Sequence, residues 1–219
     1  MQEYFTVLQA CPLFQGIDRA DISGMLDCLG AKMEQARKGA VIWSEGDPAD
    51  RLGLVLSGSV QIIKEDYYGR TNIVGIAGPG ELFGESFACS GTDLLPVSVL
   101  AAEDCAYLLL NSKRITVSCC NACAFHSQMI RNLLTIVANK NLQFHQKLEI
   151  TAKRTTREKL LAYLTSQAKQ QGKNSFTIPY DRQALADYLG VERSAMSAEI
   201  SKLRREGILK SEKCHFTLM

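Results

Sequence analysis

The pattern of hydrophobic and polar positions changes along the chain and separates it into parts. Within residues 1–35, Ile22, Met25 and Leu29 lie on one face of a predicted helix. From about residue 38 to 110, the apolar residues instead come in short β-rich runs that alternate with glycine turns. Many short strands with turns at such intervals predict an all-β barrel, roll or sandwich.

A long helix is predicted over residues 121–151, because this segment contains neither glycine nor proline and carries an apolar stripe. The stripe has the 4-3-4-3-4 spacing of a heptad seam, and its members are Ile130, Leu134, Val137, Asn141, Phe144 and Leu148. A single polar residue such as Asn141 can fix the register of a two-stranded coiled coil. The stripe therefore favours a homodimer, although a helix that packs on its own domain would show a similar pattern.

The last third of the chain has the pattern of a winged helix-turn-helix. A helix over 153–172 and a short strand at 176–179 precede two short helices that meet at Gly190. The expected inward-facing residues of these two helices are Ala184, Leu185, Leu189, Met196, Ile200 and Leu203. A hairpin that ends at Leu218 follows and would form the wing. The alternative interpretation is a plain helical hairpin that makes protein contacts.

Charge favours nucleic acid as the partner of this last part. Residues 151–219 hold 13 Lys and Arg against 7 Asp and Glu, a net charge of +6, whereas residues 1–150 have a net charge of −4. A basic segment suits contacts with phosphates. The candidate DNA-binding residues are Arg193, Ser194, Ser197, Lys202 and Arg182. Arg193 is expected to read a base, with guanine as its two-pronged partner, while Arg182 and Lys202 are expected to contact phosphates or solvent.

Composition limits the class of protein. The 219 residues, 46% hydrophobic and 22% charged, suit one large domain or two small ones and exclude wholesale disorder. No apolar run approaches the roughly 20 residues that cross a bilayer, and the N-terminus lacks the pattern of a signal peptide. We therefore expect a soluble cytoplasmic protein without membrane contacts.

Over nearly its whole length the chain resembles the CRP/FNR family of bacterial transcription regulators. The resemblance rests on the order of parts and on three stretches: Lys38-Gly39 through Glu45-Gly46-Asp47, Leu54 through Val60, and Pro79-Gly80-Glu81-Leu82-Phe83-Gly84-Glu85-Ser86. It implies an α+β fold with a jelly-roll-like double-stranded β-roll sensor domain (1–120), a dimerisation helix (121–151) and a winged helix-turn-helix domain (152–219). It also implies a non-enzymatic homodimer that binds a near-palindromic operator and contacts RNA polymerase.

The effector of such a regulator is not expected to be cyclic AMP. The family's nucleotide cassette uses a Gly-Glu helix start and an Arg-Ser/Thr pair some ten residues later; here Gly84, Glu85 and Ser86 are present. The Arg-Ser/Thr positions fall at Leu95 and Pro96, and no Lys or Arg occurs between Arg70 and Lys113. A buried phosphate would lack its cation, at a cost of about 2–5 kcal/mol. The candidate effector pocket consists of Gly84, Glu85, Ser86, Leu95, Pro96 and Val97. It would suit a less anionic ligand, or no ligand.

Eight cysteines suggest metal or redox chemistry as an alternative function. Cys119, Cys120 and Cys123 lie near His126 at the start of the long helix, where they could hold zinc or part of an iron–sulfur cluster, or act as reactive thiols. They could equally be small core residues. The family's oxygen sensors use N-terminal cysteines as ligands, a pattern that is absent here. An enzyme with a cysteine nucleophile is not favoured, because no motif places a base beside a thiol.

Overall fold

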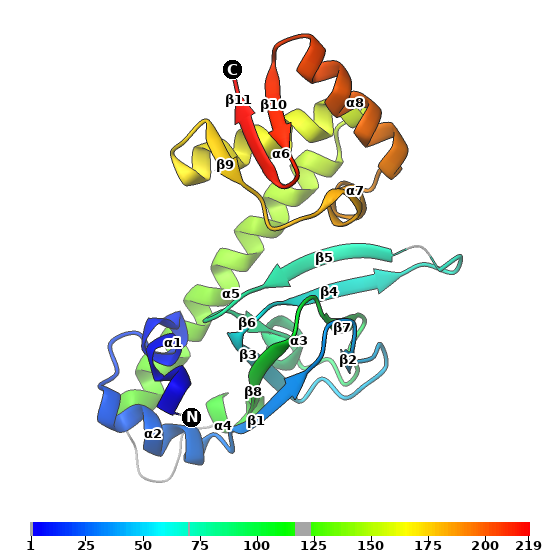
Figure 1. The fold of residues 1–219 in the computed structure, drawn as a ribbon. Helices are drawn as coiled ribbons and strands as arrows, with labels where there is room; N and C mark the ends of the chain where they lie inside the picture. The colour runs from blue at the N-terminus through cyan, green and yellow to red at the C-terminus, as the bar shows by residue number, and fades with distance from the viewer. Residues whose placement is uncertain (1, 70, 117–123) are drawn as a thin grey trace. The chain divides into compact units, whose positions relative to one another are not determined.

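The computed structural model describes residues 2–69, 71–116 and 124–219, which form two compact units (Figure 1). The first unit contains most of the chain up to Asn141. The second unit contains Leu142–Met219 together with the short segment Thr71–Ile73. The α+β fold with an N-terminal β-roll, a long helix and a C-terminal winged helix-turn-helix is confirmed.

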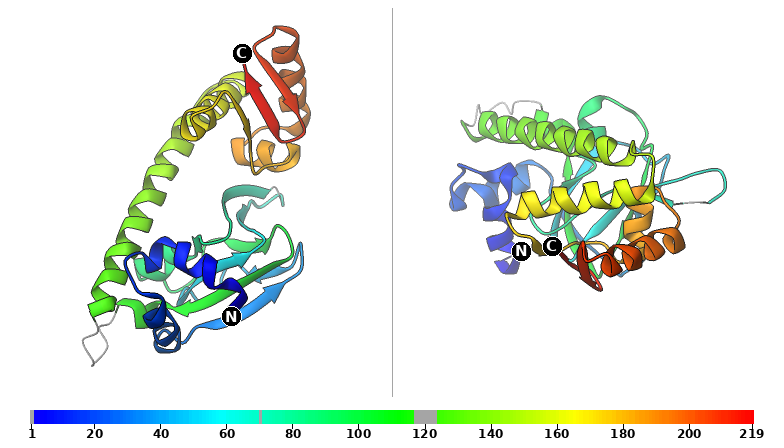
Figure 2. Two further views of the ribbon diagram at one scale, coloured as in Figure 1. Left: turned by 60° about the vertical axis from the view of Figure 1, so that its left-hand side comes forward. Right: turned by 90° about the horizontal axis from the view of Figure 1, so that it is seen from above.

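The first unit opens with short helices that cover one face of a sheet. They are η1 (Gln2–Tyr4), α1 (Phe5–Ala10), η2 (Pro12–Phe14) and α2 (Arg19–Cys28). Each places its apolar positions inward, and the buried side chains include Leu8, Leu13, Phe14, Ile22 and Leu26. These side chains belong to the same hydrophobic core as Met129 and Leu133 of the predicted long helix. Figure 2 shows the ribbon of this helix beside the N-terminal helices.

Two four-stranded sheets form the β-roll. The first has the order β1-β8-β3-β6, and its strands are Lys32–Ala36, Cys105–Asn111, Arg51–Ser57 and Leu82–Phe83. The second has the order β2-β7-β4-β5, and its strands are Val41–Trp43, Ser98–Ala101, Val60–Glu65 and Thr71–Ala77. The pairs whose register is resolved are antiparallel, with β3 and β8 paired at the centre of the first sheet.

The central strands β3 and β8 separate two hydrophobic cores, because successive side chains of a strand point to opposite faces. One core lies under the helices and receives Leu52, Leu54, Leu56, Ala106, Leu108 and Leu110. The other lies between the two sheets and receives Val55, Cys105, Tyr107 and Leu109, together with Phe83 of β6. Gly53 leaves room for the Phe83 ring, because a Cβ at this position would lie 2.0 Å from Phe83 Cζ.

Helices α3 (Glu85–Ser90) and α4 (Ser112–Thr116) precede the long helix α5 (Ala124–Thr151). The predicted first residues of the long helix, 121–123, lie outside the described residues. Asn132 fastens α5 to the N-terminal helices, since its side-chain amide donates to the carbonyl oxygens of Leu13 (2.9 Å) and Gln15 (2.8 Å).

Local sequence signals mark where the helices of the second unit begin and end. Helix α6 (Thr156–Gln171) begins with a capping box, in which Thr155 and Glu158 bond to each other's backbone, and it ends at Gly172 in the left-handed conformation (φ 63°). A three-stranded antiparallel sheet of order β10-β11-β9 contains Leu209–Glu212, His215–Leu218 and Ser175–Thr177. Between β9 and β10 lie helices α7 (Arg182–Leu189) and α8 (Arg193–Arg205).

Candidate nucleic-acid interface and effector cassette

Helices α7 and α8 form a helix-turn-helix held by a small apolar core. The Asp181 side chain caps α7 by accepting from the Ala184 N–H (2.8 Å), and Gly190 ends α7 with φ 61°. The buried residues are Leu185, Ala186 and Leu189 of α7 and Met196, Ile200 and Leu203 of α8. They match the expected inward residues except that Ala186 is buried where Ala184 is half-buried.

The outer face of α8 is polar and basic. Arg193, Ser194 and Lys202 are exposed, and Ser197 is half-buried. Helical spacing places Ser194, Ala198, Ser201 and Arg205 in one row opposite the buried stripe. Sequence reasoning did not single out Ser201, although its spacing from Met196, Ile200 and Leu203 was sufficient to place it on this row.

Arg182 is engaged within the protein. Its guanidinium carbon lies 4.9 Å from the centroid of the Phe216 ring, and its Nη2 lies 3.3 Å from Ser211 Oγ of the wing. Burial lowers the pKa of Arg182 below its usual value. The side chain therefore braces α7 against the wing, and its contact with phosphate stays a prediction.

Arg157 of α6 forms ion pairs with Glu199 of α8 and with Glu206, the residue that follows α8, and sequence reasoning missed both contacts. Its Nη1 lies 3.0 Å from Glu199 Oε1, and its Nη2 lies 2.5 Å from Glu206 Oε2. The hydrogen bonds and charge of Glu206 and Glu199 raise the pKa of Arg157. No periodic pattern in the sequence marks such a pairing across more than forty residues.

The heptad seam of α5 is largely exposed, whereas a different face of the helix packs on the first unit. Leu134 is 70% exposed and Leu148 is 64% exposed, and Ile130, Asn141 and Phe144 are also exposed. The buried face carries other residues, among them Met129 and Leu133. Val137 is the exception, because it is half-buried and packs against the core of the first unit. Packing on the helix's own domain therefore does not account for the other members of the seam.

The candidate effector cassette lies at the start of α3. Gly84 is the N-cap of this helix with φ 76°, Glu85 is buried, and Ser86 is half-buried. Leu95 and Val97 are buried and Pro96 is exposed. Cys119, Cys120 and Cys123 lie outside the described residues, while His126 is buried with its Nε2 2.8 Å from the Arg114 carbonyl oxygen.

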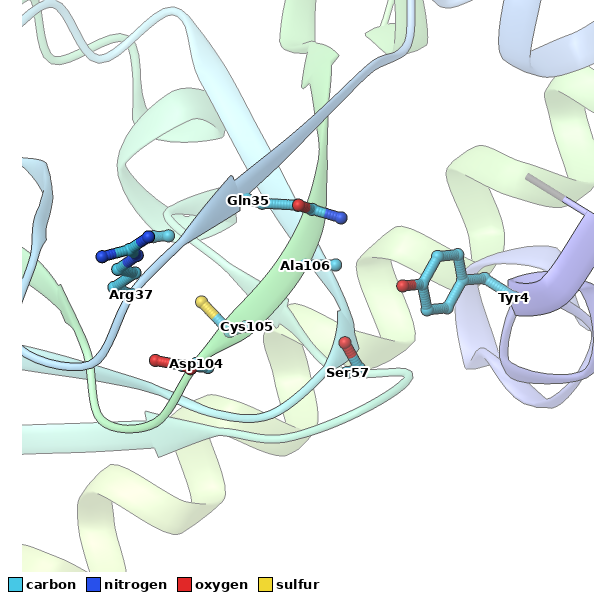
Figure 3. Close-up of a pocket in the computed structure, with 8 residues that line it drawn as sticks. Tyr4, Gln35, Arg37, Ser57, Asp104, Cys105 and Ala106 are labelled. Atoms are coloured by element: carbon cyan, nitrogen blue, oxygen red, sulfur yellow. The ribbon is translucent and has the colours of Figure 1, made fainter.

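An open hollow of about 510 Å³ lies elsewhere, at one end of the first sheet (Figure 3). Its described lining is Tyr4, Gln35, Ala36, Arg37, Ser57, Asp104, Cys105 and Ala106. In Figure 3, Tyr4 of the N-terminal helices faces the strand residues Gln35 and Ser57 across this hollow. The residues that the sequence predicted as an effector pocket belong to the cassette and not to this lining.

A β-roll, a long helix with an exposed apolar seam, and a winged helix-turn-helix with a basic outer face together define a class of DNA-binding regulator. No helix of the described part of the chain is both long and apolar enough to cross a membrane.

Comparison with known proteins agrees with this class. Residues 33–117 match the cyclic nucleotide-binding domain and residues 158–219 match the Crp-like helix-turn-helix domain. The chain belongs to the CRP/FNR family of transcription regulators.

Similar proteins match either most of the chain at low identity or a shorter part of it at higher identity. The transcriptional activator protein FnrA of Stutzerimonas stutzeri is 23% identical over 192 residues, which cover 85% of this chain and 76% of that protein. The CRP-like cAMP-activated global transcriptional regulator of Mycobacterium tuberculosis is 33% identical over 79 residues, 36% of this chain and 34% of that protein.

Two solved structures share the fold. The structure of FixK2 from Bradyrhizobium japonicum has a TM-score of 0.68 at 23% identity and covers 86% of this chain and 92% of that chain. The c-di-GMP-responsive global regulator CLP of Xanthomonas campestris has a TM-score of 0.74 at 21% identity and covers 92% of this chain and 99% of that chain.

Proposed function

We propose that the chain is a cytoplasmic, homodimeric transcription regulator that binds a near-palindromic operator in double-stranded DNA and contacts RNA polymerase. The observation that carries this proposal is the outer face of α8. This face presents polar and basic side chains, while the opposite face of the helix is buried in the core of the domain. A helix of this kind fits the major groove, where its N-terminal residues reach base edges.

The side chains of α8 divide into two roles. Arg193, at the first helical position, is the base-reading residue, because a guanidinium can donate two hydrogen bonds to guanine. Ser194 and Ser197 lie on the same end of the helix and supply hydroxyl groups. Lys202 and Arg205 lie further along and contact phosphates, which fix orientation without reading sequence.

The seam of α5 supports the dimer. Exposed leucines at heptad spacing are the surface that a second copy of the same helix would cover, and Asn141 would set the register. Two recognition helices related by a two-fold axis require half-sites about 34–36 Å apart, so dimerisation and operator symmetry go together.

Cyclic AMP is not the effector in this proposal. Leu95 and Pro96 stand where the cassette of the family places its Arg-Ser/Thr pair, and neither can neutralise a phosphate. The side chain of Lys64 reaches the Pro96 carbonyl oxygen (2.7 Å), but it is also ion-paired with Glu45. Calorimetric titration of the full-length chain with cyclic AMP is expected to give no saturable heat.

The test of DNA recognition uses a duplex selected from a random library by the full-length chain. We expect Arg193→Ala to weaken binding to this duplex by about fivefold or more, because a two-pronged contact contributes about 1–3 kcal/mol of discrimination. Lys169→Ala, which removes an exposed charge at the end of α6, is the matched control and is expected to change Kd less than about twofold. Equal affinities for wild type and Arg193→Ala would show that α8 does not read bases.

A further inference from the structure

Glu85 is a charged side chain in an environment that normally excludes charge. It is 2% exposed and begins α3 directly after the N-cap Gly84. Ser86 donates to its Oε1 at 3.2 Å, while its Oε2 is buried without a hydrogen-bond partner in the described structure. A buried carboxylate of this kind requires a partner of opposite charge.

Lys140 of α5 is that partner. Its Nζ lies 3.0 Å from Glu85 Oε1, and the same ammonium donates to the Leu82 carbonyl oxygen. The lysine side chain is 26% exposed, so the ion pair is largely removed from water. One cation therefore bridges the strand before the cassette, the cassette helix and the long helix.

Trp43 closes the cassette from another direction. Its indole packs on Gly84 so closely that a Cβ on this glycine would lie 2.5 Å from Trp43 Cζ3. The same ring stacks at a tilt on Phe83, with 4.8 Å between the ring centroids. The space beside the first turn of α3 is thus taken by a side chain of β2.

The segment that occupies the positions of the family's Arg-Ser/Thr pair, Leu95 and Pro96, also has its backbone engaged. The Leu95 N–H donates to the Asp47 carbonyl oxygen (2.8 Å), and the Leu95 carbonyl accepts from the Gly46 N–H (2.9 Å). Pro96 has no N–H to offer. Neither residue therefore supplies the main-chain donor that an anionic ligand requires.

From these contacts we infer that the cassette is closed from within: Lys140 ties it to α5, and the chain binds DNA without a small molecule at this site. This inference rests on the proposed DNA-binding function and specifies its regulation. The site is a joint between the β-roll and α5, and control of the regulator has to act through another feature.

The experiment compares full-length wild type, Lys140→Met, Lys140→Arg and the control Lys32→Met, in which an exposed lysine of β1 is replaced. Hydrogen–deuterium exchange of the peptide that covers α3 (Glu85–Ser90) reports closure directly. DNA affinity is measured on a duplex selected from a random library without additives, and again with about 1 mM cyclic AMP, a concentration that would saturate a typical effector site.

We expect Lys140→Met to speed exchange in α3 by about tenfold or more, because it leaves the buried Glu85 charge without its partner. Lys140→Arg and Lys32→Met are expected to stay within about threefold of wild type, and cyclic AMP to change the wild-type Kd less than about twofold. If Lys140→Met does not fold, the double variant Glu85→Gln/Lys140→Met replaces it, because this variant leaves no unpaired carboxylate at position 85. The rate of exchange in α3 of the double variant is expected to exceed that of the wild type.

Two results would overturn the inference. One is wild-type DNA binding that appears only with cyclic AMP; the other is a Lys140→Met variant, or the double variant, with wild-type exchange in α3. If no duplex is enriched under any condition, the proposed function fails instead, while the exchange measurement still decides whether the cassette is closed.

Discussion

The exposed seam of α5 allows one sharp prediction, which concerns Leu134. This side chain is 70% exposed although it lies at the centre of a helix whose opposite face is buried. Complete burial of a leucine side chain contributes about 1.5–3 kcal/mol. Covering its exposed part would therefore contribute about 1–2 kcal/mol for each copy, or about 2–4 kcal/mol for a symmetric dimer.

Leu134→Asp removes this contribution and also places two carboxylates at the seam, where they face each other. We expect the dimer dissociation constant to rise by at least about 30-fold, which corresponds to the lower figure of about 2 kcal/mol. Sedimentation equilibrium over a range of concentrations measures this constant directly.

Leu142→Asp is the matched control. Leu142 is 66% exposed on the same helix but lies outside the 4-3-4-3-4 seam. The control is expected to dimerise like the wild type. The reasoning is refuted if Leu134→Asp dimerises normally, or if both variants lose dimerisation to the same degree, because the seam would then not be the interface.

Three further predictions concern stability and reactivity. Gly53→Ala should lower the free energy of unfolding by about 1–3 kcal/mol in urea titrations, because its methyl group would overlap the Phe83 ring; an unchanged midpoint would contradict this packing. Burial raises the pKa of the Cys11 thiol to about 11, so at pH 8 only about one Cys11 thiol in a thousand is ionised. Mass spectrometry should therefore find the exposed Cys28 alkylated before the buried Cys11. Burial lowers the pKa of Lys147 to about 8. Between pH 8 and 9.5 the unfolded chain therefore keeps a proton on Lys147 that the folded chain has lost, so the free energy of unfolding should rise with pH. In urea titrations at these two pH values, Lys147→Met should show a smaller rise than the wild type.

Much of the fold could be predicted because its signals are local and periodic. The helix-turn-helix follows from the inward spacing on both sides of Gly190, and α6 is marked at its ends by Thr155 and Gly172. The seam of α5 was visible for the same reason. Such patterns report which face of an element is apolar, and they need no knowledge of the neighbouring element.

The site could be predicted only in part, because its decisive contacts join residues far apart in the chain. Gly84 and Glu85 were found from their order, but Lys140 and Trp43 reach them through the register of the sheets and the docking of α5. The ion pair of Arg157 with Glu199 of α8 is a contact of the same kind. An ion pair across such a distance leaves no periodicity in a single sequence.

The central claim is that two copies of this chain read a symmetric site in double-stranded DNA. Selection of duplexes from a random library by the purified full-length chain, followed by sequencing, tests it most directly. The account predicts two inverted half-sites whose centres lie about 34–36 Å apart, one turn of B-DNA. Enrichment of a single asymmetric half-site, or no enrichment at all, would contradict it.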